Sequence, residues 1–309
     1  MSAVLTVDHV VKAYGAERKA VDGIQFQVKE GICFGLLGPN GAGKSTLMKM
    51  MAGIIQADQG SITLLNQKLG TDRAIIGKHV GYVPQEITLY GELSGRQNLY
   101  FFGKMYGLRG SKLKERTSIV LDQVGLSDRA DEAVSKYSGG MKRRINIAAA
   151  LLHEPKLVVL DEPTVGIDPQ SRNHIFELIH DMKRDGKTII YSTHYLEEAE
   201  ALCDELAIID HGKIIAAGEL SQLLESHAMP AVYVEAEGWS AAADQLTSAH
   251  RIQPQGKGWL IEGANALQLI HDVSSSLIQQ GHRVRALQLQ QPTLDSVFMK
   301  LTGTALRDG

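Results

Sequence analysis

The stretch GPNGAGKST, from Gly38 to Thr46, decides how the rest of the chain is interpreted. Its first eight residues match the pattern G-x-x-x-x-G-K-[ST], in which glycines allow backbone N–H groups to turn inward around phosphate oxygens. The uncharged segment ICFGLLG before it predicts a buried strand, and LMKMMAGI after it predicts a helix whose positive end faces the same phosphates. A chance match somewhere in the chain has a probability of about 1%. The sequence therefore predicts a nucleotide-binding loop formed by Gly38, Pro39, Asn40, Gly41, Ala42, Gly43, Lys44, Ser45 and Thr46.

Four side chains in this loop and after a second strand are candidates for binding phosphate and Mg²⁺, and the glutamate among them indicates hydrolysis. Lys44 would reach the β- and γ-phosphates, and the Ser45 hydroxyl would bind Mg²⁺. A second apolar strand, LVVLDEP, ends in Asp161 and Glu162. Solvated acids are common at strand ends, and these two gain meaning from their pairing with the phosphate loop. We expect Asp161 to hold Mg²⁺, directly or through water, and Glu162 to polarise the attacking water as general base.

Two further polar residues follow predicted strands. Gln85 comes after HVGYVP and His194 comes after TIIYST. A lone glutamine or histidine is usually structural, but ligands gather at the carboxyl ends of strands in a parallel sheet. We therefore expect Gln85 to contact Mg²⁺ or the attacking water, and His194 to contact the γ-phosphate.

The segment KYSGGMKRR, residues 136–144, predicts a second phosphate site. Ser138 is a favourable helix N-cap, and Gly139 and Gly140 expose N–H groups at the start of the helix. The loop at Gly38 to Thr46 already serves the nucleotide, so the chain does not need this second site for the same phosphates. The basic residues that follow, Lys142, Arg143 and Arg144, are expected to form a solvated helix face rather than a nucleic-acid patch.

The bulk composition limits the classes of function. The net charge of −3 over 309 residues argues against a general nucleic-acid binder. The first residues lack the pattern of a signal peptide, and no apolar run approaches the roughly 20 residues of a membrane span. Cys33 and Cys203 are far apart in the sequence, which favours buried thiols in a reducing compartment over a disulfide or a metal site. We expect a cytoplasmic protein that reaches any membrane process by docking to another protein.

The order of predicted elements indicates an α/β protein with a parallel core sheet and an appended domain. Two alternating strands come first, residues from about 88 to 150 are mainly helical, and apolar strands flanked by helices follow. A hairpin around Gly212 ends this part. After about residue 221, three strands and a helix predict a small α+β unit, with the boundary between Glu219 and Ser226. The expected domains are residues 1–221 and 222–309.

The motifs together resemble those of the ATP-binding cassette (ABC) ATPases, over residues 4 to about 220. GPNGAGKST is similar to the Walker A loop, Gln85 to the Q-loop, YSGGM to the family signature and LVVLDEP to Walker B. The segment GIDP, Gly166 to Pro169, is similar to the D-loop, and His194 to the switch histidine. Val165 and Ile167 depart slightly from the usual residues there. Tyr14 is similar to the aromatic that stacks on adenine.

This resemblance implies a fold, a substrate and partners. The fold would be a RecA-like core sheet with an N-terminal antiparallel β subdomain and a helical subdomain. ATP would bind between two cassettes in a homodimer or heterodimer, with Ser138, Gly139 and Gly140 of one copy capping the γ-phosphate held by the other. Mg²⁺ would be the cofactor, and a membrane permease would hold the protein at the inner face of the cell membrane.

The resemblance is narrower in two stretches. GYVPQEITLYGELSGRQNLYFFGKMYGL and the tail QPTLDSVFMKLTG, with its motif at Pro292 to Gly303, are similar to ATPase subunits of two-component ABC-2 type exporters. The helical region after Gln85 would dock on the permease. Core packing is the alternative for its aromatic residues. The docking candidates are Tyr90, Glu92, Tyr100, Phe101 and Phe102.

Two other classes of function remain as alternatives. A non-transport cassette protein acting on ribosomes or DNA would usually carry two cassettes, coiled coils or zinc-binding cysteines. A regulatory module that uses ATP only as a structural ligand would not need the complete set of Asp161, Glu162 and His194. The C-terminal unit shows no phosphate-binding motif, which favours a dimer-stabilising or regulatory appendage.

Overall fold

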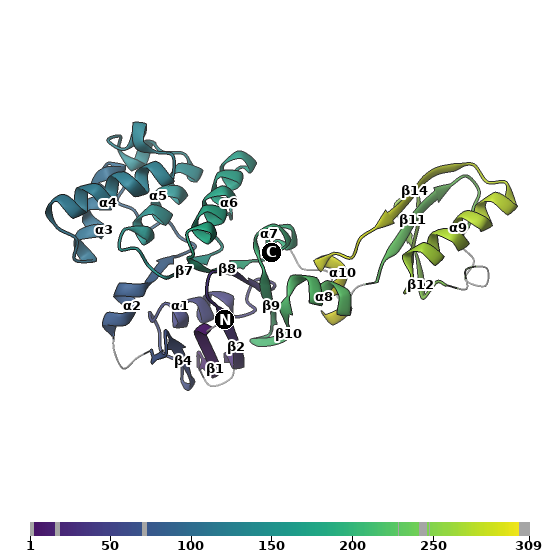
Figure 1. Cartoon of the computed structure of the whole chain (residues 1–309), viewed down its shortest axis with the longest axis horizontal. Helices are drawn as coiled ribbons and strands as arrows, with labels where there is room; N and C mark the ends of the chain where they lie inside the picture. Colours follow the sequence, from purple (N-terminus) through teal and green to yellow (C-terminus); the bar gives the residue numbers. More distant parts are fainter. Residues whose placement is uncertain are drawn as a thin grey trace. The chain divides into compact units, whose positions relative to one another are not determined.

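A computed structural model of the chain describes residues 3–15, 19–69, 73–227, 229–240, 246 and 248–302. These residues form two compact units, one that ends at Leu220 and one that begins at Ser221 (Figure 1). The first unit contains two sheets and the second unit one, and each unit has its own apolar core. Gly303 of the tail motif lies outside the described residues, as do residues 304–309 of the expected C-terminal domain. The accessory role of that domain stays a prediction.

A six-stranded sheet forms the centre of the first unit, in the order β10-β9-β3-β8-β7-β6. Five strands run parallel, and β10 pairs antiparallel with β9. The parallel arrangement brings the loops after β3, β6, β7 and β8 to one edge of the sheet. The strands are β3 (Cys33–Leu37), β6 (Val80–Val83), β7 (Leu157–Asp161), β8 (Thr188–Thr193), β9 (Glu205–Asp210) and β10 (Lys213–Glu219).

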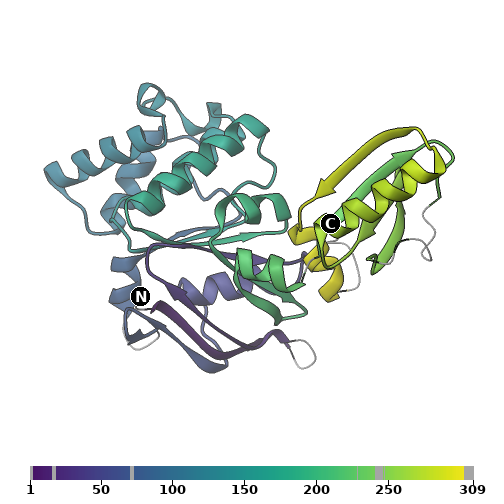
Figure 2. The same cartoon turned by 45° about the vertical axis from the view of Figure 1, so that its right-hand side comes forward.

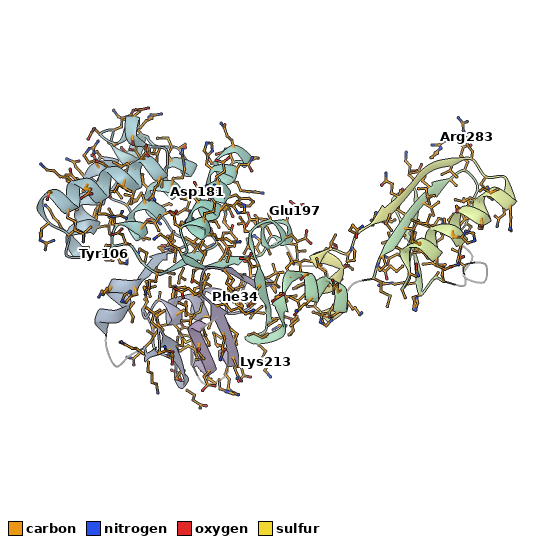
Figure 3. All side chains as sticks on the ribbon, viewed as in Figure 1. Phe34, Tyr106, Asp181, Glu197, Lys213 and Arg283 are labelled. Carbon is orange, nitrogen blue, oxygen red and sulfur yellow. The ribbon has the colours of Figure 1, made fainter. Side chains whose placement is uncertain are left out.

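A second, antiparallel sheet of the same unit has the order β2-β1-β4-β5. Its side chains alternate between the core and solvent, and its inner face shares one apolar cluster with the central sheet and with α1 (Lys44–Met51). Phe26 stacks on Phe34, with ring centroids 4.9 Å apart (Phe34 is labelled in Figure 3). The predicted fold class is confirmed. The strands are β1 (Ala3–Ala13), β2 (Lys19–Lys29), β4 (Gln59–Leu64) and β5 (Gln67–Lys68).

The helices α3, α4 and α5 gather at one end of the first unit in both views (Figures 1 and 2). Their contacts are mainly with one another, and α5 also packs on β6 and on α6. Ser94 and Gln97 form a capping box at the start of α3, which fixes where the loop after β6 becomes helical. Besides α1, the α-helices described in this unit are α2 (Arg73–His79), α3 (Gly95–Met105), α4 (Gly110–Gln123), α5 (Gly139–Leu151), α6 (Pro169–Arg184) and α7 (Leu196–Leu202).

The second unit has a four-stranded antiparallel sheet in the order β12-β13-β11-β14. Helix α9 (Ala266–Gln280) packs its apolar face on this sheet, with Val232, Val234 and Ile261 fully buried beneath it. The remaining elements are α8 (Leu220–His227), β11 (Ala231–Ala236), β12 (Arg251–Gln255), β13 (Gly258–Glu262), β14 (Val284–Gln290) and α10 (Leu294–Thr302).

Some elements were not predicted. β12 reads RIQPQ, and its proline and polar residues hid an edge strand, where a missing N–H is tolerated. The tail motif was identified, but the helix that it forms, α10, was not predicted. The helices α2 and α8 and the short β5 were also missed. Both cysteines are free and buried, as expected. Within the described ranges, no helix combines the length and the apolar character needed to cross a membrane.

Candidate functional site

The phosphate loop connects β3 to α1 and is shaped by close backbone packing. Gly43 has a φ of 108°, and a Cβ there would lie 2.1 Å from the Ala20 carbonyl oxygen. Only glycine fits both constraints. Lys44 begins α1 and is almost fully buried. Its Nζ donates to the carbonyl oxygens of Gly38 at 2.7 Å and Pro39 at 3.2 Å, so the ammonium lies across the mouth of the loop.

The carboxylate of Asp161 lies beneath Ser45 at the end of β7. It accepts hydrogen bonds from Ser192 Oγ at 2.8 Å, from Ser45 Oγ at 3.2 Å and from Tyr82 OH at 3.4 Å. Burial raises the pKa of Asp161, and the nearby Glu162 charge adds to this, while the hydroxyl donors oppose it. A buried carboxylate that is held in this way is a strong candidate for binding a cation.

These residues fit Mg²⁺. The Ser45 hydroxyl and the Asp161 carboxylate are hard oxygen donors 3.2 Å apart, close to the spacing of adjacent ligands in an octahedral shell with metal–oxygen distances of about 2.1 Å. Gln85, the third expected ligand, lines the same cavity. The fit concerns the donor set, and Mg²⁺ at this position is a proposal.

Glu162 is the point at which the four expected catalytic side chains meet. Its carboxylate lies 3.1 Å from Lys44 Nζ and 3.4 Å from His194 Nδ1, and it accepts a hydrogen bond from Gln85 Nε2 at 3.3 Å. Its backbone has a φ of 44°, in the left-handed region that non-glycine residues seldom adopt. The Ser192 hydroxyl accepts a bond from the Glu162 N–H at 3.0 Å and holds this conformation.

A cavity of about 450 Å³ opens over the phosphate loop. Tyr14, just after β1, forms part of its wall and is 57% exposed, so its ring face is available for stacking. The volume and the lining fit a nucleotide, with an aromatic ring at one side and backbone N–H groups and a lysine at the other. The described lining residues are Tyr14, Ala20, Asn40, Gly41, Gly43, Lys44, Ser45, Thr46, Gln85 and Glu162.

The second predicted phosphate site begins α5 and does not line this cavity. Ser138 is the N-cap, and its Oγ accepts from the Met141 N–H at 3.2 Å. Ser138 and Gly139 are exposed, whereas Gly140 is buried. A Cβ at Gly140 would lie 2.0 Å from Ser171 Oγ on α6, so this glycine is required for packing within the chain.

The expectation of a solvated basic face on α5 is wrong for Arg143. This side chain is 3% exposed, and its Nη atoms donate to the carbonyl oxygens of Pro84 at 2.7 Å and Gln85 at 2.5 Å. Arg144 is half-buried and donates to the Val124 carbonyl at 2.7 Å. The packing of α5 on the loop after β6 explains the difference, because that loop presents carbonyl groups that need donors. Arg143 thus connects the YSGGM helix to the Gln85 loop.

Sequence reasoning missed Tyr82, Ser192 and Arg143. Tyr82 and Ser192 lie inside apolar strands that run to the site, and both bind Asp161. A polar side chain one position before the end of a buried strand was the available signal. Arg143 gave no such signal, because charged residues early in a helix are usually solvated.

The geometry defines a class of protein. A parallel sheet whose strand ends carry a phosphate loop, an Asp-Glu pair, a glutamine and a histidine is a nucleotide-hydrolysing domain. The antiparallel sheet beside it and the separate helical region, with an exposed helix N-terminus at Ser138, narrow the class to ATP-binding cassettes.

Comparisons with known proteins agree with this class. Residues 21–165 match the ABC transporter family profile. The chain is 43% identical to the linearmycin resistance ATP-binding protein LnrL of Bacillus subtilis (strain 168), over 99% of this chain and 100% of that one. It is 39% identical to the Nod factor export ATP-binding protein I of Rhizobium sp. (strain N33), over 95% of each chain.

Solved structures give the same result. The structure of cbiO1 from Clostridium perfringens, part of the ABC transporter complex cbiONQ, covers 73% of this chain with a TM-score of 0.67 and 29% identity; the match spans 92% of cbiO1. An ATP-binding subunit of an ABC transporter covers 71% with a TM-score of 0.64 and 31% identity, over 91% of its own length. The chain belongs to the ABC transporter family, as an ATP-binding and ATP-hydrolysing subunit.

Proposed function

We propose that this subunit drives export, and that it works as a dimer in which each ATP lies between the phosphate loop of one cassette and the start of α5 of the other. The observation that supports a dimer is that the phosphate loop and the start of α5 do not line the same cavity. Ser138 and Gly139 are exposed at a helix N-terminus, yet neither lines the cavity over the phosphate loop among the described residues. An exposed helix start that serves no phosphate in its own chain is suited to one held by a second chain.

The roles of the site residues follow from their positions. Tyr14 stacks on adenine, and residues Gly38 to Thr46 wrap the phosphates with backbone N–H groups and the Lys44 ammonium. The γ-phosphate competes with Glu162 for Lys44, which lies 3.1 Å from that carboxylate. Glu162 then accepts a proton from the attacking water, while Gln85 orients the water and His194 contacts the γ-phosphate.

Ser45, Asp161 and Gln85 are the residues that would hold Mg²⁺. When bound, the ion supplies charge neutralisation to the phosphates. The chain itself contributes the placement of the oxygen donors. Ser192 and Tyr82 orient the Asp161 carboxylate through its two oxygens.

The loop after Gln85 and the helix α3 that follows it form the proposed docking surface for a membrane permease. Tyr90 is 50% exposed and Phe101 is 39% exposed, and their rings meet edge to face at 4.9 Å. These aromatic rings are therefore not core residues. Asn98 is fully buried and binds the Tyr90 N–H and carbonyl, so the surface is rigid. A rigid aromatic patch is typical of protein interfaces.

The export role rests on likeness to the relatives, whose names describe resistance and export. Docking to a permease would hold the protein at the inner face of the membrane. The described chain offers no feature that favours the ribosomal or nucleic-acid alternative.

One experiment tests the dimer. The Glu162→Gln variant should bind ATP without hydrolysing it, and size-exclusion chromatography with light scattering should show a dimer with Mg-ATP and a monomer with Mg-ADP. Lys44→Ala should stay monomeric under both conditions. A Glu162→Gln protein that binds ATP and remains monomeric would contradict the shared site.

A further inference from the structure

A buried glutamate outside the nucleotide cavity holds several parts of the site together. Glu198 lies on α7 and is 2% exposed. Its Oε1 accepts from Thr164 Oγ1 at 2.7 Å, and its Oε2 accepts from Tyr191 OH and from Thr193 Oγ1, both at 2.8 Å. Three hydroxyl groups thus converge on one carboxylate.

Such an arrangement needs an explanation, because burying a carboxylate costs free energy that hydrogen bonds only partly offset. Burial, helped by the Glu198 charge, raises the pKa of Tyr191 well above its ordinary value, so the phenol remains a donor. Glu197, the preceding residue on the same helix, is exposed (Figure 3). Solubility of α7 explains an exposed acid such as Glu197, but it does not explain a buried one such as Glu198.

The first arm of this network reaches the histidine. Thr193 directly precedes His194, and its hydroxyl also accepts from the Tyr195 N–H at 2.9 Å. The turn that carries His194 is therefore fixed on both sides by Thr193, and Thr193 is fixed by Glu198. Any movement of Glu198 would change where the His194 ring can lie.

The second arm reaches the start of α6. Thr164 follows Glu162 by two residues, and its carbonyl accepts from the Ile167 N–H at 3.1 Å inside the GIDP segment. On α6, Arg172 Nε lies 3.7 Å from Glu198 Oε1, and the Arg172 guanidinium lies 5.6 Å from the Tyr195 ring centroid. Ser171, beside Arg172, is the residue on which Gly140 of α5 packs.

We propose that Glu198 is a positioning residue that couples the His194 turn to the start of α6, and through α6 to the helix that begins at Ser138. This inference rests on the proposed function, in which His194 serves the ATP of its own chain and Ser138 serves the ATP of the partner. Glu198 then links the two ATP sites of a dimer without touching either nucleotide. Coupling between two separate sites requires a continuous set of contacts, and the hydrogen bonds of Glu198 supply part of such a set.

A double-mutant cycle on the full chain tests the first arm. Steady-state hydrolysis is measured for Glu198→Gln, His194→Ala and the double variant. We expect kcat to fall about tenfold in Glu198→Gln, with the KM for ATP changed less than about threefold. Because Glu198 acts through His194, the double variant should match His194→Ala within about twofold.

Two results would overturn the inference. The first is a double variant whose loss is the product of the two single losses. The second is a Glu198→Gln protein that hydrolyses ATP as fast as its matched control, Glu197→Gln. If His194→Ala itself keeps full activity, the proposed function fails as well, and that outcome is distinguishable because Glu198 then has no partner to act on.

The second arm is tested by single-hydroxyl removals, which also serve if Glu198→Gln does not fold. In a Glu162→Gln background, Thr164→Val should weaken the ATP-dependent dimer about tenfold, whereas Thr193→Val should leave it within about twofold. In the otherwise unchanged chain, Thr193→Val should lower kcat as Glu198→Gln does. A Thr164→Val dimer of undiminished affinity would overturn the link to the start of α5.

Discussion

The central sheet of the first unit and the sheet of the second unit bury different kinds of side chain. The strand ends of the first enclose charged and hydrogen-bonding groups, among them Asp161, Glu162, Ser192, Thr193 and His194. In the described part of the second unit, Ser276 is the only buried residue of this kind, and the core is apolar. Burying polar groups lowers stability unless they are paired. The polar groups buried at the ends of the first sheet belong to the candidate site, whereas the described core of the second unit shows no comparable cluster of polar groups.

The largest expected effect comes from matched carboxylates at the ends of strands in the two sheets. Glu162 follows β7 and Glu262 ends β13. Glu162→Gln should lower kcat by about 10²–10⁴-fold, the range for loss of a general base, with ATP binding retained. Glu262→Gln should keep kcat within about twofold. A comparable loss of kcat in both proteins, measured by phosphate release, would mean that the contrast between the sheets is not one of chemistry.

The next effect is on stability and comes from α9 in the second unit. Leu269 is fully buried and Leu267 is 79% exposed on the same helix. Leu269→Ala should lower the free energy of unfolding of this unit by about 2–5 kcal/mol, because it leaves a cavity. Leu267→Ala should change it by less than about 0.5 kcal/mol. Urea unfolding of the full chain measures both.

The same two proteins should hydrolyse ATP at the normal rate at temperatures below either transition. A fall in kcat for Leu269→Ala under those conditions would show that the second unit takes part in the catalytic cycle, which would weaken the comparison.

The sequence predicted the candidate catalytic residues better than the residues that position them through packing. Gln85, Asp161, Glu162 and His194 each follow a predicted strand, and the rule that parallel strands end together was enough to bring them to one edge. In the structure Gln85 and His194 lie at the Glu162 carboxylate and Asp161 lies at Ser45, and the individual roles of these residues stay predictions. The fold class was predictable for the same reason, since unbroken apolar strands alternating with helices indicate a covered parallel sheet.

Residues that act through packing could not be predicted. Arg143 looks like a solvated charge because its partners, the Pro84 and Gln85 carbonyls, are about 60 residues away in the sequence. Glu198 sits in the acidic run LEEAEAL, where nothing distinguishes it from Glu197. Burial of one acid out of two adjacent ones depends on which side of α7 meets the sheet. That is a property of tertiary structure.

A smaller effect separates the two glycines at the start of α5. Gly140→Ala should lower the free energy of unfolding of the first unit by about 1–3 kcal/mol, because the new Cβ would collide with Ser171. Gly139→Ala should leave stability nearly unchanged, since a Cβ there meets only Ile167 at 3.8 Å. If Gly139 caps a partner's phosphate, Gly139→Ala should still weaken the ATP-dependent dimer.

Thermal unfolding and light scattering separate these outcomes. Equal destabilisation by both substitutions would argue that α5 packs differently from the arrangement described here. An intact dimer in Gly139→Ala would instead count against a role for its N–H group.

The smallest expected effect is on the pH dependence of stability, which a buried histidine of the first unit should alter. Burial lowers the pKa of His153, which stacks on Tyr106 at 3.9 Å and contacts the Val80 carbonyl through Nε2. The unfolded chain binds a proton below a pH of about 6.5 while the folded chain resists it, so stability falls as the pH drops through this value.

We expect the first unit to lose at most about 1.4 kcal/mol of stability through His153 between pH 7.5 and pH 5.5, because the unfolded imidazole takes up its proton only over about the last pH unit of this interval. In His153→Gln, whose amide can still donate to Val80, this part of the pH dependence should disappear. His271→Gln, exposed on α9, should leave the pH dependence of both transitions as it was. If His153→Gln unfolds with the same pH dependence as the parent chain, the titrating group that destabilises the first unit lies elsewhere, and the buried polar site at the strand ends becomes the next place to test.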